Sequence, residues 1–433
     1  MNIIYMHTHD SGRYFDPYGH NIGTPDITRI AENGLLFRNA YCCGPTCSPS
    51  RAALLTGMTP HSCGMAGLAH RGFSLDDGNH HLARFLGERG YETFLCGMQH
   101  EAADPDMIGY HKLFVPESGS KAEKDEKCAA VAAEYIESPH EKPFFMSFGM
   151  ENTHRIFPEN DGGVNPDYIA LPHTLADCPA NREDMARYTV AARTVDKCVG
   201  TVLGALDGSG RINDTLVIFT TDHGLALPFH KCNCCDTGIG VALILYGAGI
   251  KLKGRVSDAL VSQIDIFPTV CDLTGLEKPE RLEGISLLPL IEGEREEVRD
   301  EIFAEVNYHV AYEPQRCVRT LTHKLIHRYD GHNSYVPANI DASPAKTALI
   351  NSGLLERVRD REELFDLTID PIERVNLIND PRYASVYSEL SAKLENWMKK
   401  TNDPLSAGRM PKPAGARINR LECIEPTEWI YEE

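Results

Sequence analysis

The chain has 433 residues, of which 42% are hydrophobic, and a formal net charge of −19. A chain of this length exceeds a single minimal core, so we expect one large domain and a smaller one. The acidic balance repels phosphate backbones and anionic lipid, which excludes nucleic acid and membrane as partners. A small-molecule or oligosaccharide substrate fits better, and an anionic substrate group would need clustered cationic side chains or a metal ion.

The start of the chain offers no targeting signal. A strand-like apolar run occupies residues 2–6, with no basic region or cleavage site before it, and no later segment supplies the roughly 18 apolar residues of a membrane span. We therefore expect a cytoplasmic protein, in which the fourteen cysteines are reduced thiols rather than a disulfide framework.

Apolar, β-rich runs alternate with helical stretches through the first two-thirds of the chain. This alternation predicts an α/β fold with a large, mostly parallel sheet that is flanked by helices on both faces. Thr24 and Pro25 open a predicted helix that Gly34 ends, and a long amphipathic run over 183–206 closes at Gly208. The expected strands are 3–7, 93–97, 144–148, 216–220 and 241–246.

After residue 290 the pattern changes to short strand-like runs and a final helix over about 383–400. The runs cover 302–306, 317–321 and 324–329. We expect a catalytic domain over 1–295 and a C-terminal α+β subdomain over 296–433, with a small antiparallel sheet. The segment 330–347 and the tail after Asn402 carry little regular signal, and each is either a mobile lid or a packing arm.

Four of the expected strands in the first domain end in polar clusters. In open α/β sheets, ligands bind at the carboxyl ends of the strands, so these clusters could converge on one site. The clusters are His7–Asp10, Gln99–Glu101, Glu151–Arg155 and Asp222–His223.

His9, Asp10, Asp222 and His223 provide carboxylate oxygens and imidazole nitrogens at two strand ends, a donor set that suits a divalent cation. The alternative is that Asp10 and Asp222 only cap the segments that follow. A second cysteine-rich segment holds Cys232, Cys234 and Cys235. It lacks a fourth ligand nearby for tetrahedral zinc, which favours reduced core or loop cysteines.

Residues 47–57 read C-S-P-S-R-A-A-L-L-T-G and fit the pattern C-x-P-S-R-x-x-x-L-T-G at every fixed position. On this motif the chain resembles the sulfatase family, which implies an alkaline-phosphatase-like α/β fold. The segment 365–377 resembles a C-terminal segment of the same family. Pro49 and the run 52–55 also place Cys47 at a helix N-terminus, where free N–H groups favour an anion.

The resemblance implies a nucleophile that is not encoded directly. In this family a formylglycine-generating (sulfatase-maturating) enzyme oxidises the motif cysteine, here Cys47, to formylglycine. One hydroxyl of the hydrated aldehyde attacks sulfur and the other expels sulfate. The resemblance puts Asp10, matured Cys47, Asp222 and His223 on one divalent cation, with His9 beside them. Calcium is the family's usual ion, whereas the imidazoles favour manganese or zinc.

Further catalytic roles follow from the same resemblance. Arg51, one turn after Cys47, would hold the hydrated aldehyde beside the metal. His100 would act as acid or base in the second step. Lys231 and His154 fall where the family contacts the sulfate and the leaving-group oxygen.

The chain departs from the family pattern at two positions. His9 stands where the family has a second Asp, and Met98 replaces the usual sulfate-binding Lys. Arg155 could supply the missing positive charge. In the C-terminal subdomain His309, Arg316 and His327 are candidate sugar contacts, although each is equally consistent with a structural role.

The expected substrate is a sulfated saccharide. Local segments resemble the branch of the family that cleaves N-sulfoglucosamine from heparan-type glycosaminoglycan fragments; they are 37–40, 213–220, 153–155 and 284–289. The alternatives are an O-sulfatase on a sulfated sugar, a phosphonate or phosphodiester hydrolase of the same superfamily, and a binding module whose Cys47 is never oxidised.

Overall fold

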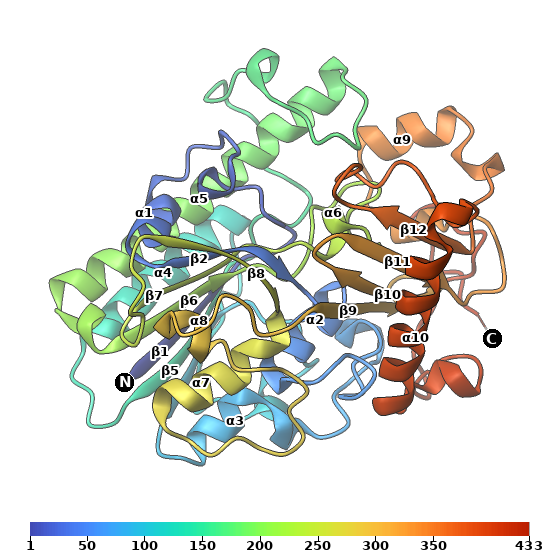
Figure 1. Ribbon diagram of the computed structural model, residues 1–433. Helices are drawn as coiled ribbons and strands as arrows, with labels where there is room; N and C mark the ends of the chain where they lie inside the picture. Colours follow the sequence, from blue (N-terminus) through green and yellow to red (C-terminus); the bar gives the residue numbers. More distant parts are fainter. Residues whose placement is uncertain (433) are drawn as a thin grey trace.

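An eight-stranded sheet forms the centre of the larger part of the molecule (Figure 1), and the computed structural model describes residues 1–432. The strand order is β4-β3-β5-β1-β6-β7-β2-β8, and only β7 runs antiparallel to its neighbours. This arrangement confirms the predicted mostly parallel sheet. The strands are β1 (Asn2–His7), β2 (Leu35–Tyr41), β3 (Glu92–Gly97), β4 (Lys112–Phe114), β5 (Phe144–Gly149), β6 (Thr215–Thr220), β7 (Leu243–Gly247) and β8 (Arg255–Ser262).

Helices cover both faces of this sheet. Side chains of the central strand β1 alternate between the two faces: Ile3 and Tyr5 pack in the core beneath α2, α3 and α7, whereas Ile4 and Met6 pack beneath α1, α4 and α5. The helices are α1 (Pro25–Asn33), α2 (Cys47–Thr56), α3 (Leu82–Gly87), α4 (Lys121–Glu137), α5 (Pro179–Gly208), α6 (Asp236–Ile239), α7 (Ile266–Thr274) and α8 (Leu288–Glu292).

A second, four-stranded sheet follows in the order β12-β11-β10-β9, with every pair antiparallel. The helix α10 packs on it through Leu390, Leu394 and Trp397, and Figure 1 shows this unit beside the ends of the large sheet. The predicted α+β character is confirmed. The elements are β9 (Glu301–Tyr308), β10 (Tyr312–Thr320), β11 (His323–Arg328), α9 (Pro344–Asn351), β12 (Glu362–Asp366) and α10 (Ala384–Lys400).

Three strands of the large sheet, β2, β4 and β8, lie outside the set expected from the sequence. β2 and β8 pair in parallel with one another, β2 also pairs with β7, and the short β4 pairs in parallel with β3. Long-range pairing of this kind overrides a weak local pattern.

The two segments of weak regular signal both act as packing arms. Within 330–347 the Asn339 side chain accepts hydrogen bonds from the backbone N–H groups of Val310 and Ala311, at 3.1 and 2.9 Å. In the tail, Asn419 accepts a 2.9 Å hydrogen bond from Arg71, which ties the chain end to the catalytic domain. These buried polar contacts fix both segments against the body of the protein.

All fourteen cysteines lie within the described residues, and none forms a disulfide there. None of the helices over residues 1–432 has both the length and the apolar character needed to cross a membrane.

A buried histidine makes the fold sensitive to acid. His81 caps α3 by accepting a 3.1 Å hydrogen bond from the Ala83 N–H, and burial lowers the pKa of His81 to about 3. The unfolded chain binds this proton near pH 6.5, so the stabilisation is present above that pH and is lost as pH falls towards 3.

We therefore expect wild-type protein to lose about 2 kcal/mol more unfolding free energy between pH 6.5 and 5 than His81→Asn, which retains a capping oxygen but does not titrate. Urea unfolding at pH 6.5 and at pH 5 measures the loss of unfolding free energy for the wild-type protein and for His81→Asn. Equal losses for the two proteins would contradict the assignment.

Candidate active site

The carboxyl ends of β1, β5 and β6 meet at one edge of the large sheet, because these strands are neighbours and parallel. Asp10 follows β1 and Asp222 follows β6, and the Asp10 N–H donates to Asp222 Oδ1 at 2.8 Å. Both carboxylates are completely buried. The turn that brings them together puts Asp10 at a φ of 52°, in the left-handed region that aspartate tolerates better than most residues.

Imidazoles surround these two carboxylates. His9 Nδ1 lies 3.0 Å from Asp10 Oδ1 and 3.0 Å from Asp222 Oδ2. His223 Nε2 lies 3.3 Å from Asp10 Oδ1 and has no hydrogen-bond partner, although it is buried. The sequence-predicted set of His9, Asp10, Asp222 and His223 therefore comes together in space.

Burial raises the pKa of both carboxylic acids, but nearby positive groups outweigh it. The Lys231 ammonium holds the pKa of Asp10 well below its ordinary value, and the Arg51 guanidinium does the same for Asp222. Two ionised, buried carboxylates are a ready site for a cation.

Cys47 begins α2 and meets this cluster. Its Sγ and ligand atoms of Asp10, Asp222 and His223 all lie within 4.8 Å of one another, and a second such group contains His9, Asp10, Cys47 and His154. Cys47 is only 4% exposed, and burial raises the pKa of its thiol. The unmodified residue is thus a neutral thiol and a weak nucleophile.

Arg51 lies one turn further along α2 and is fully buried. Its Nη2 donates to Asp222 Oδ2 at 2.9 Å and to the Thr8 carbonyl at 2.8 Å, and its Nη1 contacts His7. Arg51 therefore fixes Asp222 in place from behind the cluster. Its Nε has no hydrogen-bond partner.

The three other predicted catalytic side chains also reach the cluster. His100 Nδ1 lies 3.1 Å from His9 Nε2, His154 Nε2 lies 3.8 Å from Asp10 Oδ2, and Lys231 Nζ lies 3.1 Å from the same oxygen. Burial lowers the pKa of His100 well below its ordinary value and that of His154 to about 4, so both imidazoles are neutral. Burial opposes the charge on Lys231, but Asp10 and Asp341 raise its pKa well above the usual value.

Asp341 is a site residue that the sequence did not reveal. Its Oδ2 lies 3.4 Å from Lys231 Nζ, and its side chain is 18% exposed. It lies in the segment 330–347, where no motif or periodicity singles it out. His309 is buried close to Lys231 and Asp341, and its Nδ1 has no hydrogen-bond partner.

The structure does not bring Arg155 and Arg316 to the cluster as free cations. The Arg155 guanidinium forms a bidentate pair with Asp184, at 2.8 and 2.5 Å, and donates to the Ala226 carbonyl. Arg316 is fully buried between Glu305 and Asp403, at 3.0 and 2.5 Å. A sugar contact would require either guanidinium to leave these partners.

Two other candidates have structural surroundings. His327 stacks on Tyr329 and lies 3.3 Å from Glu362, in the C-terminal sheet. Cys232, Cys234 and Cys235 do not belong to any group in residues 1–432 that could hold a metal ion. Cys234 is buried with Cys317, which agrees with the prediction of core or loop cysteines.

The donor set fits a divalent cation. Asp10 and Asp222 offer ionised oxygens, and the buried, unpartnered Nε2 of His223 faces both of them. A cation between these atoms would satisfy the orphaned nitrogen and offset the paired negative charges. His61, Glu305 and Asp403 also lie close enough to hold an ion, but Arg316 already pairs with both carboxylates.

The fold and this site define a hydrolase of the alkaline-phosphatase-like class. The family model described as Sulfatase matches residues 2–276, and a model described as N-sulphoglucosamine sulphohydrolase, C-terminal, matches residues 229–352. The chain belongs to the sulfatase family.

Relatives extend the likeness over nearly the whole chain. Human N-sulphoglucosamine sulphohydrolase is 30% identical, over 93% of this chain and 91% of that protein. Among solved structures, a 2-O GAG sulfatase superposes with a TM-score of 0.76 at 23% identity, covering 97% of this chain and 96% of that one. The phosphonate monoester hydrolase of Agrobacterium radiobacter superposes with a TM-score of 0.71 at 19% identity, covering 92% of this chain and 96% of that one. These two structures are alike in fold.

Proposed function

We propose that the protein removes sulfate from a sulfated saccharide, and specifically cleaves the sulfamate of N-sulfoglucosamine in heparan-type glycosaminoglycan fragments. The observation that carries this proposal is the meeting of Cys47 with Asp10, Asp222 and His223 within 4.8 Å at the start of α2. The substrate choice is supported by the 30% identity to human N-sulphoglucosamine sulphohydrolase.

The nucleophile in this proposal is formylglycine made from Cys47 by a maturating enzyme. The hydrated aldehyde would supply two hydroxyls, one to attack sulfur and one to expel sulfate on deprotonation. Arg51 holds Asp222 rigidly beside this position, with 2.9 Å between Nη2 and Oδ2. A fixed neighbour keeps the reacting group aligned without reorganisation during the reaction.

The charges around the site suit a sulfamate. Lys231 is 3% exposed and carries a positive charge next to Asp10. This ammonium and the free N–H groups at the start of α2 would stabilise the oxygens of the sulfuryl group. The leaving nitrogen must gain a proton as its bond to sulfur breaks. Lys231 and His154, which both lie beside Asp10 Oδ2, are proposed to supply it.

His100 is proposed to take the proton in the second step. It is neutral because burial lowers its pKa, and its Nδ1 lies 3.1 Å from His9 Nε2. A neutral imidazole in a desolvated pocket can accept a proton from a nearby hydroxyl. His9 is held in one orientation by both carboxylates, so it also orients His100.

One divalent cation completes the proposed site. Asp10, Asp222 and His223 would hold it, with His9 and the matured Cys47 beside them. Calcium is the ion expected from the family, while imidazole nitrogens favour manganese or zinc. The cation would polarise the sulfuryl oxygens and lower the pKa of the attacking hydroxyl.

A comparison of substrates tests the activity. We expect kcat/KM for glucosamine N-sulfate to exceed the values for an O-sulfated glucosamine, an aryl sulfate and a phosphodiester by roughly a hundredfold or more. Steady-state release of sulfate or phosphate measures all four with one enzyme preparation. A preference for the O-sulfated sugar would support an O-sulfatase, and a preference for the phosphodiester would support a phosphohydrolase; either result overturns the proposed substrate.

A further inference from the structure

A second cavity lies directly behind the loop that carries Lys231. It has a volume of about 350 Å³. Phe229 and Asn233 of this loop line it on one side, and residues of the C-terminal sheet line it on the other. Lys231 stands between these two residues in the chain, so its Cα lies within about 7 Å of the Cα of each. The cavity is therefore a close neighbour of the proposed sulfate site, on the other side of one loop.

Arg328 of β11 is a deeply buried cation in the lining of this cavity. Its side chain is only 5% exposed, and its Nη2 donates to Glu363 at 2.7 Å. Its Nε and Nη1 are buried and have no hydrogen-bond partner. Buried guanidinium N–H groups without acceptors are costly, so a group that brings oxygen acceptors to Arg328 would be stabilised there.

Two further arginines and the rings of Phe229 and Tyr335 also line the cavity. Arg374 is exposed at the rim, and Arg359 pairs with Glu313 and lies over the Tyr335 ring, 4.8 Å from its centroid. Tyr335 meets Phe229 edge to face, with centroids 6.1 Å apart. Flat rings beside guanidinium groups match the shape and charge of a sugar ring that carries an anionic substituent.

The acidic residues of the cavity do not cancel this preference. Glu363 is paired with Arg328, and Glu373 lies 2.7 Å from Lys324 Nζ and accepts a hydrogen bond from the Asp236 N–H. Both carboxylates are thus already engaged, whereas two nitrogens of Arg328 are free.

The segment 330–347 joins the two sites. Tyr335 lines the cavity, and Asp341, six positions later, pairs with Lys231 at 3.4 Å. The same two stretches of chain, this segment and the Lys231 loop, thus form walls of both sites.

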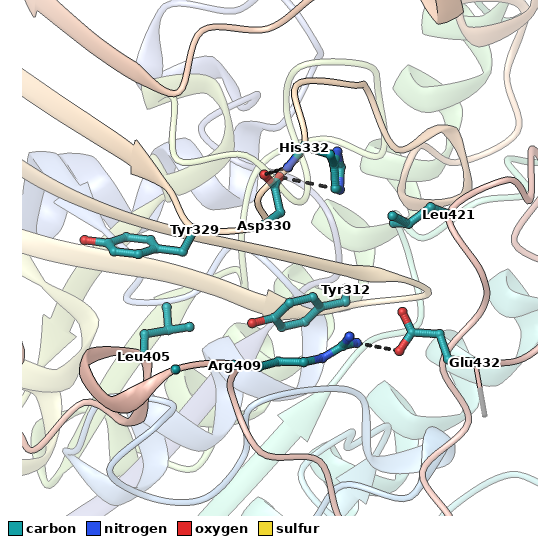
Figure 2. A pocket seen from close by; sticks show the side chains of 9 residues that line it. Tyr312, Tyr329, Asp330, His332, Leu405, Arg409, Leu421 and Glu432 are labelled. Carbon is teal, nitrogen blue, oxygen red and sulfur yellow. Dashed lines mark hydrogen bonds and ion pairs between the residues drawn. The ribbon is translucent and has the colours of Figure 1, made fainter.

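A cavity of about 380 Å³ at the start of β10 provides a contrast (Figure 2). There Arg409 is paired with Glu432, and Asp330 is paired with His332, as the dashed lines show. Arg409 has no buried nitrogen without a hydrogen-bond partner, whereas Arg328 keeps two, Nε and Nη1, besides its pair with Glu363.

We propose that the cavity around Arg328 binds the anionic group of the sugar unit next to the one that loses its sulfate. The group is a carboxylate or a sulfate ester, because both present the oxygens that a guanidinium binds. This inference rests on the proposed function, and it makes the enzyme selective for charged oligosaccharides over the free monosaccharide.

The test uses Arg328→Gln and Arg374→Gln, with Arg357→Gln as the matched control, because Arg357 is exposed and outside the cavity. Substrates are glucosamine N-sulfate, a hexuronate–glucosamine N-sulfate disaccharide, its carboxyl-reduced analogue and its 2-O-sulfated form. We expect Arg328→Gln to lower kcat/KM for the charged disaccharides about tenfold or more and to leave the monosaccharide and the reduced analogue unchanged. Arg374→Gln should act in the same direction.

The monosaccharide rate reports whether each variant is correctly folded. A greater loss on the hexuronate disaccharide identifies the carboxylate as the bound group, and a loss confined to the 2-O-sulfated form identifies the sulfate ester. Equal effects on all four substrates, or none in either variant, would overturn the inference while the proposed function stands. If the wild-type enzyme hydrolyses none of the four substrates, the proposed function fails. Calorimetric binding of the hexuronate disaccharide then tests the cavity on its own. Binding by the wild-type protein that is lost in Arg328→Gln would support the inference, and no binding by the wild-type protein would refute it.

Discussion

Replacement of Cys47 by alanine is expected to abolish turnover, with a fall in kcat of roughly 10⁴-fold or more. The residue begins α2, where its side chain meets Asp10, Asp222 and His223, and no other nucleophile occupies that position in the proposed mechanism. Sulfate release from the best substrate measures the loss. The fold should persist, since the change removes a single buried sulfur atom.

The matched control is Cys271→Ala, which removes an equally buried thiol from α7, away from the site. It should keep the wild-type rate. Intact mass adds an independent readout, because conversion of Cys47 to formylglycine lowers the mass by about 18 Da, and this difference should be absent from Cys47→Ala. Wild-type turnover in Cys47→Ala, or full activity of a wild-type chain without the mass change, would refute the proposed nucleophile.

Replacement of Asp222 by asparagine is expected to impair both catalysis and stability. The amide keeps an oxygen for the Asp10 and His223 N–H groups but loses the charge that pairs with Arg51 at 2.9 Å. An uncompensated buried guanidinium costs about 3–5 kcal/mol of unfolding free energy. The loss of a metal ligand should lower kcat/KM by roughly a hundredfold to a thousandfold.

Three measurements separate these effects. Urea unfolding in the presence of a chelator reports the ion pair alone, elemental analysis reports the cation bound per chain, and steady-state kinetics report turnover. Asp258→Asn serves as the control, because Asp258 is 72% exposed and pairs with Arg38 only loosely, at 3.4 Å. A variant at position 222 with wild-type metal content and rate would contradict the assigned role.

Much of the large sheet was predictable, because its central strands are continuous apolar runs that end in polar clusters. β1, β5 and β6 are buried on both faces, and this leaves a clear pattern in the sequence. β2 and β8 are not predictable in this way, because their stability depends on each other across more than two hundred residues. A local pattern does not contain such a pairing.

The same distinction applies to the candidate site. Asp10, Cys47 and Asp222 were found because each belongs to a motif or follows a buried strand. The sequence presents Arg155 as a free cation because its partner, Asp184, lies 29 positions away in the chain. Asp341 was overlooked for the converse reason, since its importance comes only from the position of Lys231.

The pairing of Lys231 with Asp341 has a consequence for how the protein is made. The charge balance of the site depends on a carboxylate at position 341 of 433, far from the strand that supplies Asp10. Contacts between such distant positions form late, because the intervening chain must first be ordered. During synthesis, a nascent chain that stops before residue 341 already contains Cys47, Asp10 and Asp222. Its Lys231 ammonium can then pair with Asp10 but not with Asp341. The site is therefore completed only after Asp341 has been synthesised and its segment has packed against the Lys231 loop.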